Sequence, residues 1–298
     1  MKIRFAITPP ASALGDAVFG KYLETVERLG FDTLWLSDIP LGPLGDPLLS
    51  LTYAAARTRK LKLGANVVPL GRNPLWLAKQ LAQLDRLCEG RLLLSFVPGL
   101  GAPAERRALG YGDADRGQAI EIIIDLLRRW WAGETVTAAY EGMSYDAIDL
   151  PLRPVQQPLE IWLGGKGRLA LERVARLGDG WLTSAVTPEE AAAGRRAIEA
   201  HALQCGRRVD DEHFGISIPA TLSDLPGGAV DALRARRKDG DVSQIIAVGR
   251  QGLRALVQAH LDAGISKFVL RPLNALDAAS DWQADLDWIA DSVLDLQC

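Results

Sequence analysis

The sequence has few of the side chains that bind metals or form disulfide bonds, with three histidines and three cysteines among 298 residues. Cys88, Cys205 and Cys298 share no spacing typical of a metal site or a redox pair, so we expect unpaired thiols in a reducing compartment. No His-x-His pair or carboxylate cluster occurs where a metal could be held. The sequence therefore predicts a protein without a metal centre.

An excess of charge of one sign and long apolar runs are also missing. The net charge is −3 with both signs interspersed, which disfavours a nucleic-acid partner. No apolar run approaches the length of a membrane-spanning helix. The residues after Met1 lead directly into a predicted strand, without the pattern of a cleavable signal. We therefore expect a cytoplasmic protein that binds neither nucleic acid nor a membrane.

Strand and helix patterns alternate along most of the chain, and 48% of its residues are hydrophobic, enough for a large core. The strand patterns cover residues 2–7, 32–36, 61–64, 91–96, 159–163, 180–183, 213–220 and 267–271. The helix patterns cover residues 16–29, 47–57, 74–87, 115–132, 168–177, 188–204, 229–238, 251–263 and 281–296. Eight strands, nearly all followed by a helix, predict an α/β fold, a (β/α)8 TIM barrel forming one domain over residues 1–298.

Residues 134–158 interrupt this alternation. They contain several prolines and glycines and a Thr-Val-Thr pattern. These features indicate a segment inserted into the barrel, with a short antiparallel hairpin, rather than a domain boundary.

In a TIM barrel the chemistry takes place at the carboxyl ends of the strands. The residues that follow the predicted strands include one carboxylate, Asp38, and no histidine or catalytic lysine. This composition disfavours a Schiff-base aldolase and a Ser-His-Asp hydrolase. It favours chemistry supplied by a cofactor, with the protein providing position and electrostatics. Asp38 is the candidate catalytic residue, and capping of a turn is its alternative role.

A glycine-rich segment follows the predicted strand 159–163 and precedes a helix. Gly164, Gly165 and Gly167 allow close approach to the backbone, and the helix amino terminus favours an anion, so we consider a phosphate site. Lys166 or Arg168 would add positive charge. A plain glycine turn is the alternative, and the segment lacks the G-x-G-x-x-G pattern of a dinucleotide fold.

Motifs along nearly the whole chain resemble the bacterial-luciferase-like oxidoreductases. They lie at residues 30–38, 46–48, 61–64, 72–75, 78–81, 84–87, 90–92, 154–158, 161–165, 175–181 and 263–272. The resemblance implies a TIM barrel with an inserted segment and an oxidoreductase that uses F420 in hydride transfer or reduced FMN with oxygen as a monooxygenase. It also implies a homodimer formed through the second and third helices, with Trp76 near the interface, and, for FMN, a partner reductase.

Carried over by position, the resemblance assigns the flavin-type ring to Asp38, Ala65, Asn66, Val67, Val97, Pro98 and Gly99. It assigns the phosphate to Gly164, Gly165, Gly167 and Arg168, and Ser184 joins the cofactor-binding set. It also implies a cis peptide bond at Asn66–Val67. Two departures matter. Ile39 stands where many relatives have a proton-donating histidine, and the loop at residues 95–101 lacks an acidic residue that some F420-dependent sugar-phosphate dehydrogenases have there.

The substrate remains open, because loops at residues 41–45, 102–115 and 222–244 form its pocket. High use of Ala, Leu and Arg suggests a GC-rich source, which favours F420 over FMN. A non-catalytic barrel that binds a cofactor or metabolite is the alternative function. A cofactor-free barrel lyase is a third, weakened by the missing lysine and carboxylates.

Overall fold

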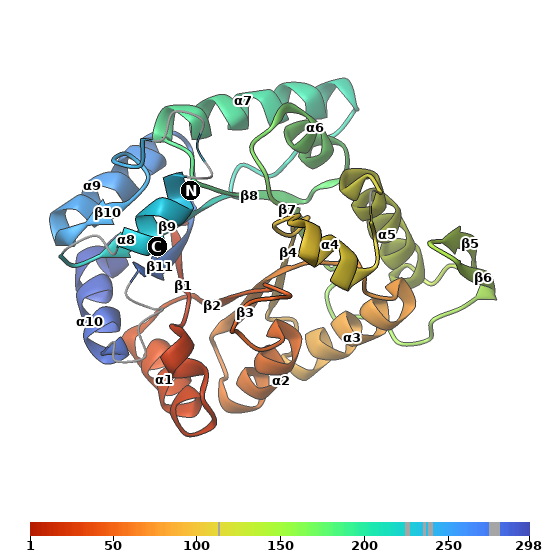
Figure 1. The fold of residues 1–298 in the computed structure, drawn as a ribbon, viewed down its shortest axis with the longest axis horizontal. Helices are drawn as coiled ribbons and strands as arrows, with labels where there is room; N and C mark the ends of the chain where they lie inside the picture. Colours follow the sequence, from red (N-terminus) through yellow and green to blue (C-terminus); the bar gives the residue numbers. More distant parts are fainter. Residues whose placement is uncertain (113, 224–226, 235–236, 238–240, 274–280) are drawn as a thin grey trace. The chain divides into compact units, whose positions relative to one another are not determined.

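The computed structural model describes residues 1–112, 114–223, 227–234, 237, 241–273 and 281–298 (Figure 1). Its main sheet contains β1 (Arg4–Ile7), β2 (Thr33–Ser37), β3 (Lys62–Val67), β4 (Leu92–Phe96), β7 (Ile161–Leu163), β8 (Gly180–Ser184), β9 (Phe214–Thr221), β10 (Ala247–Val248) and β11 (Lys267–Pro272). The order is β10-β9-β11-β1-β2-β3-β4-β7-β8, and β8 also pairs with β9, which closes the ring. The predicted (β/α)8 TIM barrel is thus confirmed, with β10 beside it.

The helices of the described residues follow the predicted alternation. They are α1 (Asp16–Leu29), α2 (Pro47–Arg57), α3 (Pro74–Leu87), α4 (Pro103–Leu109), α5 (Arg116–Trp131), α6 (Arg168–Leu177), α7 (Pro188–Gln204), α8 (Gly227–Arg234), α9 (Gly249–Asp262) and α10 (Trp282–Val293), with 3-10 turns at Ala11–Leu14 and Leu294–Leu296. The chain divides into two compact units. The first contains Met1–Leu36, Arg57–Lys62 and Leu163–Cys298, and the second contains Ser37–Ala56 and Leu63–Trp162.

In the first unit, parallel strands β8, β9, β11, β1 and β2 carry a helical layer. α6 packs on α7, α7 on α9, α9 on α10 and α10 on α1. Phe5 and Phe268 are register partners on β1 and β11, and their buried rings stack with centroids 5.3 Å apart. Cross-strand aromatic pairs of this kind stabilise a sheet beyond the area that they bury.

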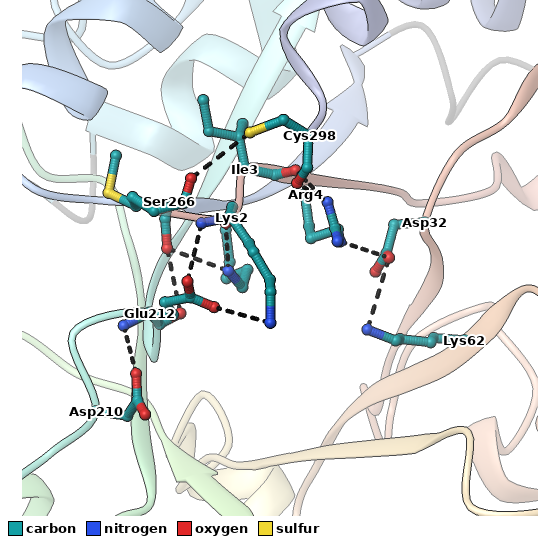
Figure 2. Close-up of polar contacts among 11 residues, drawn as sticks. Lys2, Ile3, Arg4, Asp32, Lys62, Asp210, Glu212, Ser266 and Cys298 are labelled. Carbon is teal, nitrogen blue, oxygen red and sulfur yellow. Dashed lines mark hydrogen bonds and ion pairs between the residues drawn. The ribbon is translucent and has the colours of Figure 1, made fainter.

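An ionic network lies at the amino end of the strands of this unit (Figure 2). The Asp32 carboxylate pairs with Arg4 at 3.1 Å and with Lys62 at 3.6 Å. Glu212 accepts a hydrogen bond from the backbone of Lys2 at 3.0 Å, and Arg4 also donates to the carbonyl oxygen of Cys298. The catalytic residues of TIM barrels lie at the opposite, carboxyl ends of the strands. We therefore expect these paired charges to stabilise the fold rather than to take part in catalysis.

In the second unit, β3 pairs with β4 in parallel register, and α3 packs on α5. The predicted hairpin is confirmed: β5 (Val136–Tyr140) pairs with β6 (Met143–Ile148) in antiparallel register, and Figure 1 shows it beside α5. The Trp130 ring contacts Tyr145 edge to face, and its Nε1 donates to the Ile148 carbonyl at 3.2 Å. The hairpin is therefore fastened to α5.

Several elements differ from the sequence-based expectation, among them β10 and the 3-10 turn at Ala11–Leu14, which were not predicted. β3 continues beyond residue 64 to Val67, because Asn66 keeps its register with Ser95. α4 was not predicted. The helix expected at residues 229–238 begins earlier, at Gly227, and α8 ends at Arg234. Residues 235, 236 and 238 of that prediction lie outside the described residues.

Candidate functional site

In the second unit, Asp38 contacts the carboxyl end of β3. Its backbone N–H donates to the Asn66 carbonyl at 2.9 Å, and its Oδ2 accepts from the Val68 N–H at 3.1 Å. Arg72 Nη2 donates to the same oxygen at 2.9 Å. The carboxylate is 8% exposed, so these contacts fix its orientation.

Arg72 extends this connection to the start of α2. Its Nη2 lies 2.9 Å from Asp46 Oδ2, and its Nε donates to the Val68 carbonyl at 3.2 Å. Asp46 Oδ1 accepts from the Leu48 N–H at 2.8 Å, which caps α2. Burial lowers the pKa of Arg72, but the Asp38 and Asp46 carboxylates raise it more, so the guanidinium stays charged. The loop between β2 and α2 is thus tied to the loop between β3 and α3.

The three consecutive residues expected to contact a ring lie in regular strand. Ala65 and Val67 are fully buried, whereas Asn66 is half-buried, with its Nδ2 3.4 Å from Ser37 Oγ. The predicted cis bond at Asn66–Val67 is wrong, because the cis bond found in the described residues is Gln157–Pro158. The backbone here keeps the regular hydrogen bonds of a strand. The carbonyl of Asn66 accepts from the N–H of Asp38, and the carbonyl of Val67 accepts from the N–H of Val97.

The loop after β4 contains Val97, Pro98 and Gly99, all half-buried. Sequence reasoning missed Glu105 of α4, which is 2% exposed and whose Oε1 accepts from the Gly101 N–H at 2.8 Å. Pro103 in the first turn of this helix, followed by an acidic residue, is the usual signature of a helix start and would have predicted α4.

In the first unit, Gly167 is the N-cap of α6 and provides no side-chain cap. A Cβ added to Gly167 would meet nothing within 4 Å. Gly165 has a φ of 106°, and its carbonyl accepts from Trp181 Nε1 at 2.8 Å. The space beside the N-cap of α6 is thus open and no side chain caps the helix, an arrangement that suits an anion. Gly164, half-buried, precedes this turn.

Both cations expected near this turn, Lys166 and Arg168, have partners, and Arg237 adds a third charge. Arg168 is 75% exposed and pairs with Glu172 along α6 at 2.6 Å. Lys166 Nζ donates to the Ala185 carbonyl at 3.0 Å, directly after Ser184 at the end of β8. Arg237 Nη1, missed in the sequence, also reaches this carbonyl, at 3.4 Å, and pairs with Glu190.

The histidines lie away from these strand ends. His260 of α9 is fully buried, and burial lowers its pKa to about 4, so it is neutral at neutral pH. His213 Nδ1 lies 2.9 Å from the Asp179 carbonyl oxygen, before β9. Within the described ranges, no group of three His, Cys, Asp or Glu side chains could hold a metal ion. No helix in this part of the chain is long and apolar enough to cross a membrane.

Comparison with proteins of known sequence finds distant relatives. The chain is 26% identical to 5,10-methylenetetrahydromethanopterin reductase of Methanolobus tindarius over 254 residues, 83% of this chain and 74% of that protein. It is 28% identical to limonene 1,2-monooxygenase of Rhodococcus erythropolis over 203 residues, 65% of this chain. The match spans about half of that monooxygenase, 52% of its length.

Solved structures share the fold. An F420-dependent secondary alcohol dehydrogenase in complex with an F420–acetone adduct aligns over 100% of both chains, with a TM-score of 0.82 and 17% identity. The oxygenating constituent of 3,6-diketocamphane monooxygenase from Pseudomonas putida, in complex with FMN, aligns over 100% of this chain and 99% of that one, with a TM-score of 0.77 and 14% identity. The family pattern described as luciferase-like monooxygenase matches residues 12–298. The chain therefore belongs to the luciferase-like monooxygenase family.

Proposed function

We propose that this chain is an oxidoreductase that uses F420 or reduced FMN to act on a small organic substrate. The family match and the relatives with reductase and monooxygenase activities support this function. The observation that carries it is the uncapped amino terminus of α6, where glycine leaves room for an anionic group. The high use of Ala, Leu and Arg, typical of a GC-rich coding sequence, favours F420, and the FMN version would need a partner reductase to supply reduced flavin.

Taken separately, each unit offers residues that suit one part of such a cofactor. Its phosphate would be held by Gly164, Gly165, Gly167 and Arg168, with Lys166 between them adding charge. Ser184, at the end of β8, is a further cofactor-binding candidate. The ring of the cofactor would lie against Ala65, Asn66, Val67, Val97, Pro98 and Gly99. The cofactor would supply the redox chemistry, and the protein would bind, orient and exclude water.

Asp38 is proposed as the residue nearest to the reacting centre. One of its oxygens is fixed by Arg72 and the Val68 amide, whereas Oδ1 has no hydrogen-bond partner among the described residues. That oxygen can accept a hydrogen bond from the polar edge of the ring. Ile39 stands where many relatives have a proton-donating histidine. Its hydrocarbon side chain has no proton to donate.

Titration of the purified protein with FMN and with F420, followed by fluorescence, tests the proposal. We expect micromolar binding of one of the two, and oxidation of the reduced cofactor when substrate or oxygen is present. A non-catalytic carrier would bind the reduced cofactor without ever oxidising it. Binding of neither cofactor would contradict the proposal.

We also propose that the chain forms a homodimer through α2 and α3. These helices line a groove of about 440 Å³. Leu49 and Trp76, which both line it, are 74% and 60% exposed, and apolar side chains gathered in one exposed groove suit a contact with a second copy. Sedimentation should give the mass of a dimer, and Trp76→Glu should shift it to the monomer. A wild-type monomer at micromolar concentration would contradict this arrangement.

A further inference from the structure

We infer that Glu105 and Arg116 are positioning residues that hold the loop after β4 in its binding conformation. The loop, residues 97–101, carries three of the residues proposed to contact the cofactor ring. The effect on cofactor binding rests on the proposed function, whereas the effect on the loop itself does not.

Glu105 holds the loop through a charged acceptor. Its Oε1 accepts from the Gly101 N–H at 2.8 Å, and the residue is 2% exposed. A hydrogen bond to a buried carboxylate is stronger than one between neutral groups. The carboxylate also occupies the space next to Gly99, where an added Cβ would lie 2.5 Å from Oε1.

Arg116 holds the same loop through its carbonyl groups. Its Nη1 donates to the Pro98 carbonyl at 3.2 Å and to the Gly99 carbonyl at 3.4 Å. A Cβ added to Gly101 would lie 2.3 Å from this nitrogen. Gly99 and Gly101 have φ values of 70° and 72°, in the left-handed region where glycine is favoured. A side chain at either position would be strained by the positive φ and would displace the end of Glu105 or of Arg116.

The loop so held keeps two hydrogen-bond donors available. The N–H groups of Gly99 and Leu100 have no partner among the described residues. A Cβ on Gly99 would also lie 3.6 Å from Val68, the residue that Asp38 and Arg72 fix. The anchored loop thus adjoins the end of β3. Donors that are fixed in advance bind an oxygen atom of a ligand without a further ordering cost.

Hydrogen exchange and cofactor titration of Glu105→Gln, Arg116→Met and Arg116→Lys test this inference. We expect the Gly101 amide, whose N–H is bound to Glu105, to exchange about tenfold faster or more in the first two variants. Gln would accept this hydrogen bond without a charge, and Met would leave the Pro98 and Gly99 carbonyls without their Arg116 donor. Affinity for the cofactor that the wild type binds should fall by a similar factor. Arg116→Lys should restore part of both, since its ammonium reaches one carbonyl. Arg107→Gln is the control, because Arg107 lies on α4 with Glu105 and its side chain is exposed.

The outcomes separate the two claims. Unchanged exchange in the loop of both variants would overturn the inference, whatever the cofactor result. Faster exchange confined to the loop with unchanged affinity would show that Glu105 and Arg116 hold a loop outside the site, and would overturn their role in binding. If the wild type binds neither cofactor, the proposed function fails while the exchange measurement still decides the role of the two side chains in the loop.

Discussion

Gly167→Asp is expected to abolish cofactor binding while leaving the protein folded. An aspartate at the N-cap of α6 would accept hydrogen bonds from the first-turn amides and place a negative charge where the phosphate is proposed to bind. Losing two charge-assisted hydrogen bonds lowers affinity by about a hundredfold or more. Capping itself changes stability by only a few tenths of a kcal/mol relative to glycine.

Gly167→Ser is the matched control, because its hydroxyl caps the same amides without a charge. We expect an intermediate loss of affinity and a melting temperature at or above that of the wild type. Gly165 is less suitable, since any side chain there would be strained at a φ of 106° and would meet Ala170 at 2.7 Å. If Gly167→Asp binds the cofactor as tightly as the wild type, the anionic group binds elsewhere.

Asp85→Asn is expected to lower the free energy of unfolding by about 3 kcal/mol, because it leaves buried donors facing an amide that can itself donate. Asp85 is fully buried. Its Oδ2 accepts from the N–H groups of Val155 and Gln156 at 2.7 and 2.9 Å, and its Oδ1 accepts from Gln156 Nε2 at 2.7 Å. An asparagine cannot accept all three hydrogen bonds. The contact joins α3 to the segment before β7.

Urea unfolding of Asp85→Asn beside Asp125→Asn measures this effect. Asp125 undergoes the same chemical change, but its side chain is 63% exposed and pairs with Arg129 along α5. We expect Asp125→Asn to change stability by less than about 0.5 kcal/mol. Equal stabilities of the two variants would show that the three hydrogen bonds of Asp85 contribute little.

The elements that sequence predicted best are those with local signals. α1 spans the predicted residues 16–29 and ends where Gly30 adopts a φ of 92°. α3 begins as predicted, because Asn73 caps the amides of the first turn and Pro74 fits the first helical position. These signals act within four residues, so they can be read directly along the chain.

The site was only partly predictable. Its location at the strand ends, and the candidates Asp38, Asn66 and Gly167, came from the order of elements and from resemblance. The contacts of Asp38 could not be predicted in this way, because Arg72 lies 34 residues away along the chain. Glu105 and Arg237 were missed, since each has ordinary neighbours in sequence and becomes distinctive only through Gly101 and Glu190.

The sequence by itself determined the barrel, its hairpin insertion, the helix boundaries with strong caps and the family. These depend on periodicity, on turn chemistry and on motifs within short segments. Only the tertiary structure decided which charged side chains meet and that the Asn66–Val67 bond lies in a regular strand. It also decided at which glycines an added side chain would meet neighbouring atoms. Such contacts depend on how distant segments of the chain pack, which no local pattern records.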